Sequence, residues 1–431
     1  MKRRDFLKAV TGLVGFPYFV SSSALGKAGT VAPSNRLVMG AIGVGSMGRG
    51  DLSGFLNKSE VQVVAVCDVD SRHTAQAKQM VDKKYGSGDC SVYEDYRDLI
   101  GRGDLDVVMH ALPDHWHGII AVACARAGLD IHGQKPLSRT IKDGRAICDA
   151  VKRYGRIWQT GSWQRSVAYF HKAAELVYTG RIGKVKYAEV GLPDGRGSKV
   201  LPVTPVPAGM NYDMWLGPAP WREHVSLGGR GGSVHWDWRW VMDYSGGQLT
   251  DWAGHHIDIA HWGLGFDGTG PVEITDAKGE YPKEGTYDVP TAYKFRCKYA
   301  NGVEIVVAND AQQPHGRGTR WYGENGKWIH VRRGKLSASS DAILKEVISP
   351  EEKGLYKSRD HLQNFIDCVK SRKETVTPAE TAHRSISVGQ LGEIAMLTGK
   401  DLKWDPEKEV FTNDEIANRY LSRPMRAPWH L

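Results

Sequence analysis

The sequence predicts a two-domain α/β protein, in which a doubly wound parallel sheet precedes an α+β domain with a large, mainly antiparallel sheet. Three observations favour this class. Strand-like and helical segments alternate early in the chain, a glycine-rich turn follows the first strand, and hairpin turns separate strand-like runs later on. The expected segments are an export signal at 1–24, the first domain at 36–158, the second at 159–405, and an extended C-terminal tail at 406–431.

The composition is that of an ordinary globular protein. The chain has 431 residues, of which 41% are hydrophobic and 25% charged, so it can bury a large core and is not generally disordered. No apolar run approaches the roughly 20 residues that cross a bilayer, so no membrane span is expected. The formal charge of +8 includes no long Lys/Arg block, which argues against a nucleic-acid partner. The six scattered cysteines predict single buried thiols.

The first 24 residues resemble a twin-arginine export signal. The stretch R-R-D-F-L-K at 3–8 precedes a modest apolar stretch at 9–20 and small residues near Ala24. Signals of this type export folded proteins, so we expect a periplasmic location and a cofactor that is loaded before export. A short amphipathic helix of the mature protein is the alternative.

A glycine-rich turn, G-V-G-S-M-G at 43–48, joins a predicted strand at 36–42 to a helix that runs toward Phe55. The first glycine allows the tight turn, the second lets the backbone approach a pyrophosphate, and the third permits close helix–strand packing. Free N–H groups at the start of the helix attract phosphate. The turn predicts a Rossmann-type dinucleotide site, with a purely structural turn as the alternative. The expected contacts are Gly43, Gly45, Ser46, Met47 and Gly48.

An acidic residue follows the second predicted strand, which covers 61–66. Asp68 lies 20 positions after the last glycine of the turn, where a carboxylate accepts hydrogen bonds from the adenosine ribose. A carboxylate there repels a 2′-phosphate and favours NAD over NADP. Arg72 is close enough in sequence to keep NADP open as the alternative.

The alternation of strands and helices continues after this unit. Further strands are expected at 105–109 and 130–132, and helices at 118–127 and 141–154. In doubly wound sheets, ligands bind beyond the carboxyl ends of the strands. The motifs P-D-H-W-H at 113–117 and Q-K-P at 134–136 lie at such ends.

From about Arg36 to Asp405 the chain resembles the glucose–fructose oxidoreductase, inositol dehydrogenase and rhizopine-catabolism (Gfo/Idh/MocA) family, in its exported branch. The motifs concerned are the glycine turn, P-x-x-x-H at 113–117, Lys135-Pro136, and G-G-Q-L-T-D-W-A-G-H-H-I-D at 246–258. The resemblance implies the catalytic residues Lys135, Asp251 and His255. It also implies cofactor contacts at Pro113, Trp116, His117, Lys135 and Gln164.

The chemistry of alcohol oxidation suits these residue types. A base must take the hydroxyl proton as hydride leaves carbon, and His255 titrates near neutrality. Asp251, one helical turn earlier, would orient the imidazole, and Lys135 would bind the developing alkoxide. A core histidine and a surface lysine are the alternatives. No metal site is predicted, because the histidines near Asp258 fit one helical face poorly.

Position 134 departs from the family, which usually has Glu before the lysine where this chain has Gln134. Without that neighbouring carboxylate, Lys135 should lose its proton more easily and could share the role of base.

The second domain contains several strand-like runs. Asn301-Gly302 and Asn325-Gly326 predict hairpin turns. Strands are expected at 185–190, 272–281, 291–299, 303–307 and 328–331, and helices at 358–371 and 380–398. The resemblance implies a homo-dimer or homo-tetramer formed through this sheet.

Tryptophan is concentrated in the middle of the chain, where nine of the 14 fall between 158 and 262. Trp236, Trp238 and Trp240 would share one strand face, either stacking on a sugar or packing in the core. The segment G-S-W-Q-R at 161–165 resembles a family segment near the nicotinamide and substrate. The expected substrate contacts are Trp163, Arg165, Trp238 and His256.

The resulting hypothesis is an NAD-dependent carbohydrate oxidoreductase that acts on a secondary hydroxyl of a pyranoside, with C3 suggested by the resemblance alone. An exported enzyme would have to hold its NAD tightly. The alternatives are an NAD-dependent glycoside hydrolase, which oxidises C3 transiently and then eliminates, and a non-enzymatic sugar-binding or regulatory protein.

Overall fold

The computed structural model describes residues 31–431 apart from 229–230, 233 and 350, so the predicted export signal lies outside the described residues. The first domain is built on a parallel six-stranded sheet in the order β3-β2-β1-β4-β5-β6. Its strands are β1 (Leu37–Ile42), β2 (Val61–Cys67), β3 (Ser91–Tyr93), β4 (Val107–His110), β5 (Asp130–Gly133) and β6 (Trp158–Thr160). The predicted doubly wound sheet is confirmed.

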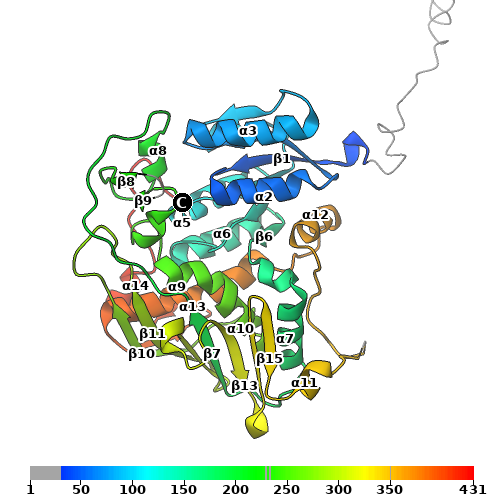
Figure 1. The fold of residues 1–431 in the computed structure, drawn as a ribbon, viewed down its shortest axis with the longest axis vertical. Coiled ribbons are helices and arrows are strands. Elements are labelled where there is room, and N and C mark those ends of the chain that lie inside the picture. The colour runs from blue at the N-terminus through cyan, green and yellow to red at the C-terminus, as the bar shows by residue number, and fades with distance from the viewer. Residues whose placement is uncertain (1–30, 229–230, 233, 350) are drawn as a thin grey trace, which may run out of the picture.

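Helices cover both faces of this sheet (Figure 1). Helices α2 (Ser46–Leu56) and α3 (Ser71–Tyr85) share one apolar core with α12 (His361–Ser371), which comes from far along the chain. The opposite core contains α4 (Tyr96–Ile100), α5 (Asp114–Arg126) and α6 (Ile141–Arg153). Later residues thus complete the first domain.

The second domain is built on a mixed nine-stranded sheet in the order β15-β14-β13-β7-β12-β11-β10-β16-β17. Every neighbouring pair is antiparallel except β7 and β12, which run parallel. The mainly antiparallel sheet is therefore confirmed. Its strands are β7 (Tyr187–Leu192), β10 (Glu273–Glu280), β11 (Ala292–Lys298), β12 (Glu304–Asn309), β13 (Gly318–Tyr322), β14 (Trp328–Arg332), β15 (Lys335–Ala338), β16 (Leu402–Asp405) and β17 (Val410–Phe411).

Three helices pack against this sheet from the side of the first domain (Figure 1). They are α7 (Ala168–Tyr178), α10 (Asp258–Leu264) and α13 (Ala379–Thr398). The remaining elements are α8 (Tyr212–Leu216), the short pair β8 (Ser226–Gly228) and β9 (Gly231–Gly232), α9 (Gly247–Trp252), α11 (Asp341–Lys345) and α14 (Glu415–Arg419). Among the described residues, no helix has the length and apolar character that crossing a membrane requires.

The tryptophan-rich segment is not a strand. Residues Asp237–Trp240 form a 3₁₀ helix, η3, in which Trp238 and Trp240 are buried while the preceding Trp236 is 48% exposed. The prediction of one shared strand face is wrong, because the turn of a 3₁₀ helix sends alternate side chains in different directions.

The C-terminal tail is not a free extended arm. It contains β17 and α14 and folds back on its own chain, where Trp429 packs edge-on against Trp116 at a centroid distance of 4.8 Å. Leu421 is buried, and its carbonyl accepts a hydrogen bond from the N–H of Lys142 on α6.

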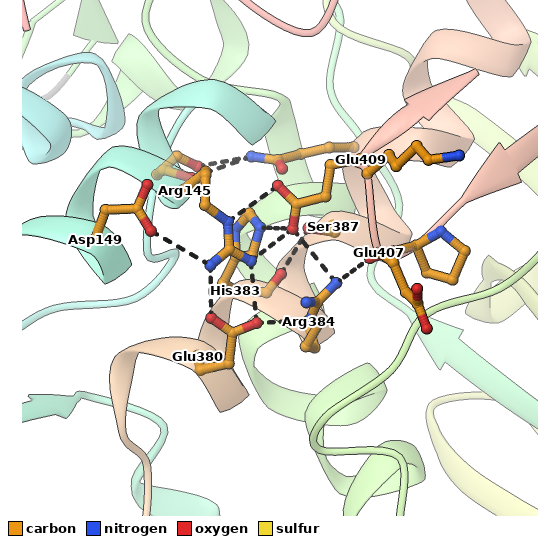
Figure 2. Close-up of polar contacts among 12 residues, drawn as sticks. Arg145, Asp149, Glu380, His383, Arg384, Ser387, Glu407 and Glu409 are labelled. Atoms are coloured by element: carbon orange, nitrogen blue, oxygen red, sulfur yellow. Dashed lines mark hydrogen bonds and ion pairs between the residues drawn. The ribbon is translucent and has the colours of Figure 1, made fainter. Parts of the chain in front are cut away.

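An ion cluster secures the start of this tail. Figure 2 shows Arg145 between the carboxylates of Glu380 and Glu409, with Nη atoms at 2.8 and 2.6 Å. His383 Nε2 lies 2.8 Å from Glu409, and Arg384 Nε lies 2.7 Å from Glu380. The cluster joins α6, α13 and the turn before β17.

Candidate active site

A cavity of about 480 Å³ opens at the carboxyl ends of β1, β2 and β4 and is covered by the segment before α9. Its walls come from the glycine turn, the loop after β4 and residues 235–239 of the second domain. The predicted residues that line it are Gly43, Gly45, Ser46, Met47, Gly48, Asp68, Pro113, Trp116, Lys135 and Trp238.

The glycine turn has the shape that a pyrophosphate needs. Gly43 has a φ of +74°, and a Cβ there would lie 2.5 Å from the carbonyl oxygen of Ala111. A Cβ at Gly48 would lie 1.9 Å from the carbonyl oxygen of Gly43. Helix α2 begins next to Gly45 with no side-chain cap, so its first N–H groups are free for an anion. These residues therefore fit a bound dinucleotide.

Asp68 lies at the end of β2 and is held by backbone donors. Its two carboxylate oxygens accept hydrogen bonds of 2.9 Å from the N–H groups of Val44 and Asp70. Arg72 turns away and binds Asp70 through Nε and Nη2, at 3.0 and 2.6 Å. Asp68 thus places a carboxylate at this end of the cavity, and Arg72 is paired with Asp70. Arg49 also lines the cavity and donates to the carbonyl of Val44 at 2.8 Å.

A segment of the second domain covers this end of the cavity. His235 Nε2 lies 3.2 Å from Asp70 Oδ2, and its ring lies 4.6 Å from that of His73. The ligating atoms of Asp70, His73 and His235 lie within 4.8 Å of one another, but the Asp70 carboxylate is already occupied by Arg72. We call residues 234–240 the covering segment.

The motif after β4 divides into a wall residue and a buried one. Trp116 lines the cavity and donates its indole N–H to the carbonyl of Trp215, at 3.0 Å. His117 is fully buried, and its two ring nitrogens lie 2.6 and 2.9 Å from the carbonyls of Pro136 and Leu112. This corrects the expected cofactor contact: His117 fixes the loop that carries Lys135.

Lys135 lines the cavity. Its Nζ donates a 2.7 Å hydrogen bond to Asp251 Oδ1, and both side chains are nearly buried. Arg239 of the covering segment approaches the same carboxylate, at 3.6 Å. Burial alone would raise the pKa of Asp251, but Lys135 and Arg239 outweigh it and hold that pKa below its usual value.

His255 lies in a π-helical turn, η4 (Ala253–Ile257), between α9 and α10. Gly254 lets this turn pack closely on Lys135, since a Cβ there would lie 3.1 Å from that of Lys135. Burial, followed by Lys135 and Arg333, holds the pKa of His255 well below its usual value. The imidazole is therefore neutral, and its Nδ1 has no hydrogen-bond partner among the described residues.

Asp251 does not orient His255 as predicted. The structure shows no hydrogen bond between the two side chains, and the Asp251 carboxylate is bound to Lys135 instead. A π turn, in which the backbone bonds run i to i+5, changes the side-chain register on which the prediction depended.

Two carboxylates from elsewhere in the chain, Asp51 and Asp251, take the place of the one that position 134 lacks. Gln134 donates its amide to Asp51 Oδ2 at 2.7 Å, and burial raises the pKa of Asp51 to about 6. Lys135 is itself paired with Asp251. The expectation that Lys135 has no neighbouring carboxylate is wrong, because the fold supplies one, Asp251, that the local sequence lacks.

The segment after β6 packs against the π turn that carries His255. Gln164 is fully buried and does not line the cavity; its amide nitrogen lies 3.5 Å from the His255 carbonyl and 3.4 Å from His256 Nδ1. His256 is also buried, between Phe170 and Trp252, which corrects its expected substrate contact.

Arg165 is a structural residue rather than a substrate ligand. Its guanidinium is 1% exposed and donates four hydrogen bonds of 2.7 to 2.9 Å to Asp258 and Asp267. Trp163, by contrast, is 37% exposed and lies edge-on to His255 at 6.4 Å.

The fold brings three further residues to the site that the sequence does not predict. Arg239 Cζ lies 4.4 Å from the ring of Trp238 and reaches Asp251. Trp252 lies edge-on to His255 at 5.4 Å, and Arg333 lies over it at 4.4 Å. Trp252 belongs to the motif at 246–258, whereas Arg239 and Arg333 belong to no recognisable pattern.

The chain is similar to two groups of curated bacterial proteins over about a third of its length. It is 30% identical over 172 residues to a glycosyl hydrolase family 109 protein of Shewanella baltica, and 31% identical over 150 residues to an inositol 2-dehydrogenase of Salmonella paratyphi B. These matches cover 35% and 34% of this chain. The chain spans less than half of each relative's own length, 37% of the first and 43% of the second.

The fold is similar to that of solved dehydrogenases. The WlbA dehydrogenase from Bordetella pertussis, solved with NADH and UDP-GlcNAcA, aligns with a TM-score of 0.62 at 15% identity and covers 86% of this chain and 99% of its own.

Two family models account for most of the sequence. Residues 37–162 match the model described as an oxidoreductase family, NAD-binding Rossmann fold. Residues 194–431 match the C-terminal α/β domain of the same family. The chain therefore belongs to the Gfo/Idh/MocA oxidoreductase family.

Proposed function

We propose that the protein is an NAD-dependent carbohydrate oxidoreductase that oxidises a secondary hydroxyl of a pyranoside, with C3 as the position. The observation that carries this proposal is the Lys135–Asp251 pair at 2.7 Å: Lys135 lines the cavity and lies against the π turn that carries the neutral His255. Family membership and the sugar-related names among the relatives support it.

The proposed chemistry assigns one task to each side chain. NAD, when bound, supplies the hydride acceptor. His255 accepts the hydroxyl proton, which its neutral imidazole can do at physiological pH. Lys135, held in place by Asp251, stabilises the negative charge that develops on the substrate oxygen. Burial on both sides excludes water from this proton transfer.

NAD rather than NADP is the proposed cofactor. Asp68 presents a carboxylate where a 2′-phosphate would lie, and Arg72 is paired with Asp70 instead of facing the cavity. The covering segment reaches from the second domain to Asp70, which supports tight retention of the cofactor. Tight retention suits the proposed export to the periplasm through a twin-arginine signal. A homo-dimer or homo-tetramer is proposed from family resemblance alone.

A glycoside hydrolase is the second candidate, and the 30% identity to a family 109 protein favours it. Such an enzyme would oxidise C3 transiently, eliminate the aglycone and return the hydride. The similarity to an inositol 2-dehydrogenase is almost equal, at 31% identity. The oxidation step alone accounts for the Lys135–Asp251 pair, without any elimination of an aglycone.

The experiment uses protein purified without added cofactor and mixed with a panel of glycosides. Reduced-nicotinamide absorbance is followed together with product mass. Net reduction, with the matching keto-sugar as product, supports the oxidoreductase. Release of nitrophenol from nitrophenyl glycosides without lasting reduction supports the hydrolase. Unaltered sugar after long incubation, despite binding, contradicts both and favours a sugar-binding protein.

A further inference from the structure

Arg333 lies in the turn between β14 and β15, and two tryptophans hold its guanidinium in place. Its Cζ atom lies 4.8 Å from the ring centroid of Trp163 and 4.4 Å from that of Trp252. The same two indoles flank His255, at centroid distances of 6.4 and 5.4 Å. Trp163 and Trp252 therefore lie beside both Arg333 and the proposed base, His255. We call these two tryptophans the aromatic frame.

The guanidinium of Arg333 makes a single hydrogen bond within the described part of the chain, and no ion pair there. Its Nε donates to Gln164 Oε1 at 3.1 Å. Gln164 is fully buried, so this acceptor fixes the plane of the guanidinium. Partial burial lowers the pKa of Arg333, yet a guanidinium stays charged at neutral pH. The residue is exposed, so its two Nη groups are open to solvent and to a ligand.

The other cations beside His255 already share a carboxylate. The carboxylate of Asp251 binds Lys135 at 2.7 Å and approaches Arg239 at 3.6 Å. Two cations thus share one anion, and Arg333 adds a further positive charge. Among these four side chains, three are cationic and one is anionic.

Arg317 provides a comparison on the same frame. Its Cζ atom lies 5.3 Å from the ring of Trp252, much as Arg333 does. Unlike Arg333, Arg317 binds a carboxylate, that of Asp310, with Nε and Nη2 at 2.9 and 2.7 Å. The missing carboxylate at Arg333 is therefore a specific feature of that position.

We propose that the substrate is an acidic sugar, a hexuronic acid or its glycoside, whose carboxylate is bound by Arg333 while a ring hydroxyl faces His255. This inference rests on the proposed function and names its substrate class. The planar pair of Nη groups matches a carboxylate with two parallel hydrogen bonds. A phosphate ester carries more charge and more acceptor oxygens than one guanidinium satisfies.

The test measures binding before catalysis. Intrinsic tryptophan fluorescence of the holoprotein is titrated with methyl glucuronide, methyl glucoside and glucose 6-phosphate. We expect the glucuronide to bind at least about tenfold more tightly than the glucoside, the size expected for a charge-assisted pair. The preference should fall to less than about twofold in Arg333→Met and be partly retained in Arg333→Lys.

Arg332→Met is the matched control, because Arg332 is the exposed neighbour at the end of β14 and contacts neither Trp163 nor Trp252 in the structure. It should keep the full preference. Equal binding of glucuronide and glucoside, tighter binding of glucose 6-phosphate, or an unchanged preference in Arg333→Met would each overturn the proposal.

The same samples separate this inference from the proposed function. A glucuronide preference that depends on Arg333, with no reduction of cofactor by any sugar, would leave the binding assignment standing and contradict the oxidoreductase. Rapid oxidation of neutral glycosides, unaffected by Arg333→Met, would keep the oxidoreductase and contradict the acidic substrate.

Discussion

Lys135 and Asp251 are 116 positions apart in the sequence, yet their Nζ and Oδ1 atoms lie 2.7 Å apart. The pair joins the turn after β5 to the helix that leads into η4, so this hydrogen bond is one of those that connect the two domains. Asp251 therefore acts on the lysine, and the histidine four positions later is left free to exchange a proton.

Replacing Asp251 with Asn should lower kcat by about 10²- to 10³-fold, because Lys135 loses the carboxylate that holds it in place. The amount of NAD bound after purification should be unchanged, since Asp251 does not line the cavity. Steady-state kinetics and cofactor extraction check both. Asp89→Asn, at an exposed position, is the control; loss of NAD with kcat intact would contradict this role.

His255 should give no inflection near its ordinary pKa of 6.5 in the pH profile of kcat/KM, because burial holds its pKa well below that value. A lowered histidine pKa keeps the neutral, proton-accepting form as pH falls through 6.5. His255→Gln should lower kcat by about 10²- to 10⁴-fold, while exposed His315→Gln should not. An inflection near 6.5 that disappears in His255→Gln would show a histidine that titrates normally.

Replacing His235 with Ala should speed the loss of NAD on dialysis, by about three- to tenfold, because the covering segment loses its contact with Asp70. The expected cofactor-to-protein ratio after dialysis is lower than in wild type and in the control His315→Ala. Fluorescence of bound NADH gives the dissociation rate. Identical rates in all three proteins would mean that the segment does not retain the cofactor.

The ion cluster of Figure 2 should make stability depend on acid pH. Burial alone would raise the pKa of Glu409, but the bonds from His383 and Arg145 outweigh it and lower that pKa to about 2 from 4.5. A lowered carboxyl pKa contributes stability above 4.5 that is lost as pH falls toward 2.

Glu409→Gln should therefore lower the free energy of unfolding by about 1–3 kcal/mol at pH 7 and by less at pH 3. Urea unfolding at the two pH values measures the difference. Exposed Glu407→Gln should change neither value. An equal loss at both pH values would show that packing, rather than charge, explains the effect of Glu409.

Most of the first domain could be predicted from sequence, because its strands and helices follow local patterns. Helix α3 was not predicted, although Asp70 caps it through a hydrogen bond to the N–H of Arg72. In the second domain, the parallel pairing of β7 with β12 could not be read locally, since it depends on contacts between segments over a hundred residues apart.

The site residues divide in the same way, into those that a local motif predicts and those that depend on long-range contacts. The glycines and Lys135 belong to short motifs and line the cavity. Arg165 looked like a ligand by its place in a motif, but two distant carboxylates bury it. Arg333 has no motif at all, and only the sheet register brings its turn to the tryptophans.

The packing of Trp429 on Trp116 bears on when the cofactor can be loaded. Trp116 is synthesised early and forms part of the cavity wall, whereas Trp429 supports it from behind and is synthesised hundreds of residues later. A nascent chain that has finished its first domain still lacks that support and the covering segment. We therefore expect NAD capture to follow translation, and a ribosome-stalled chain shortened at residue 405 to hold no cofactor.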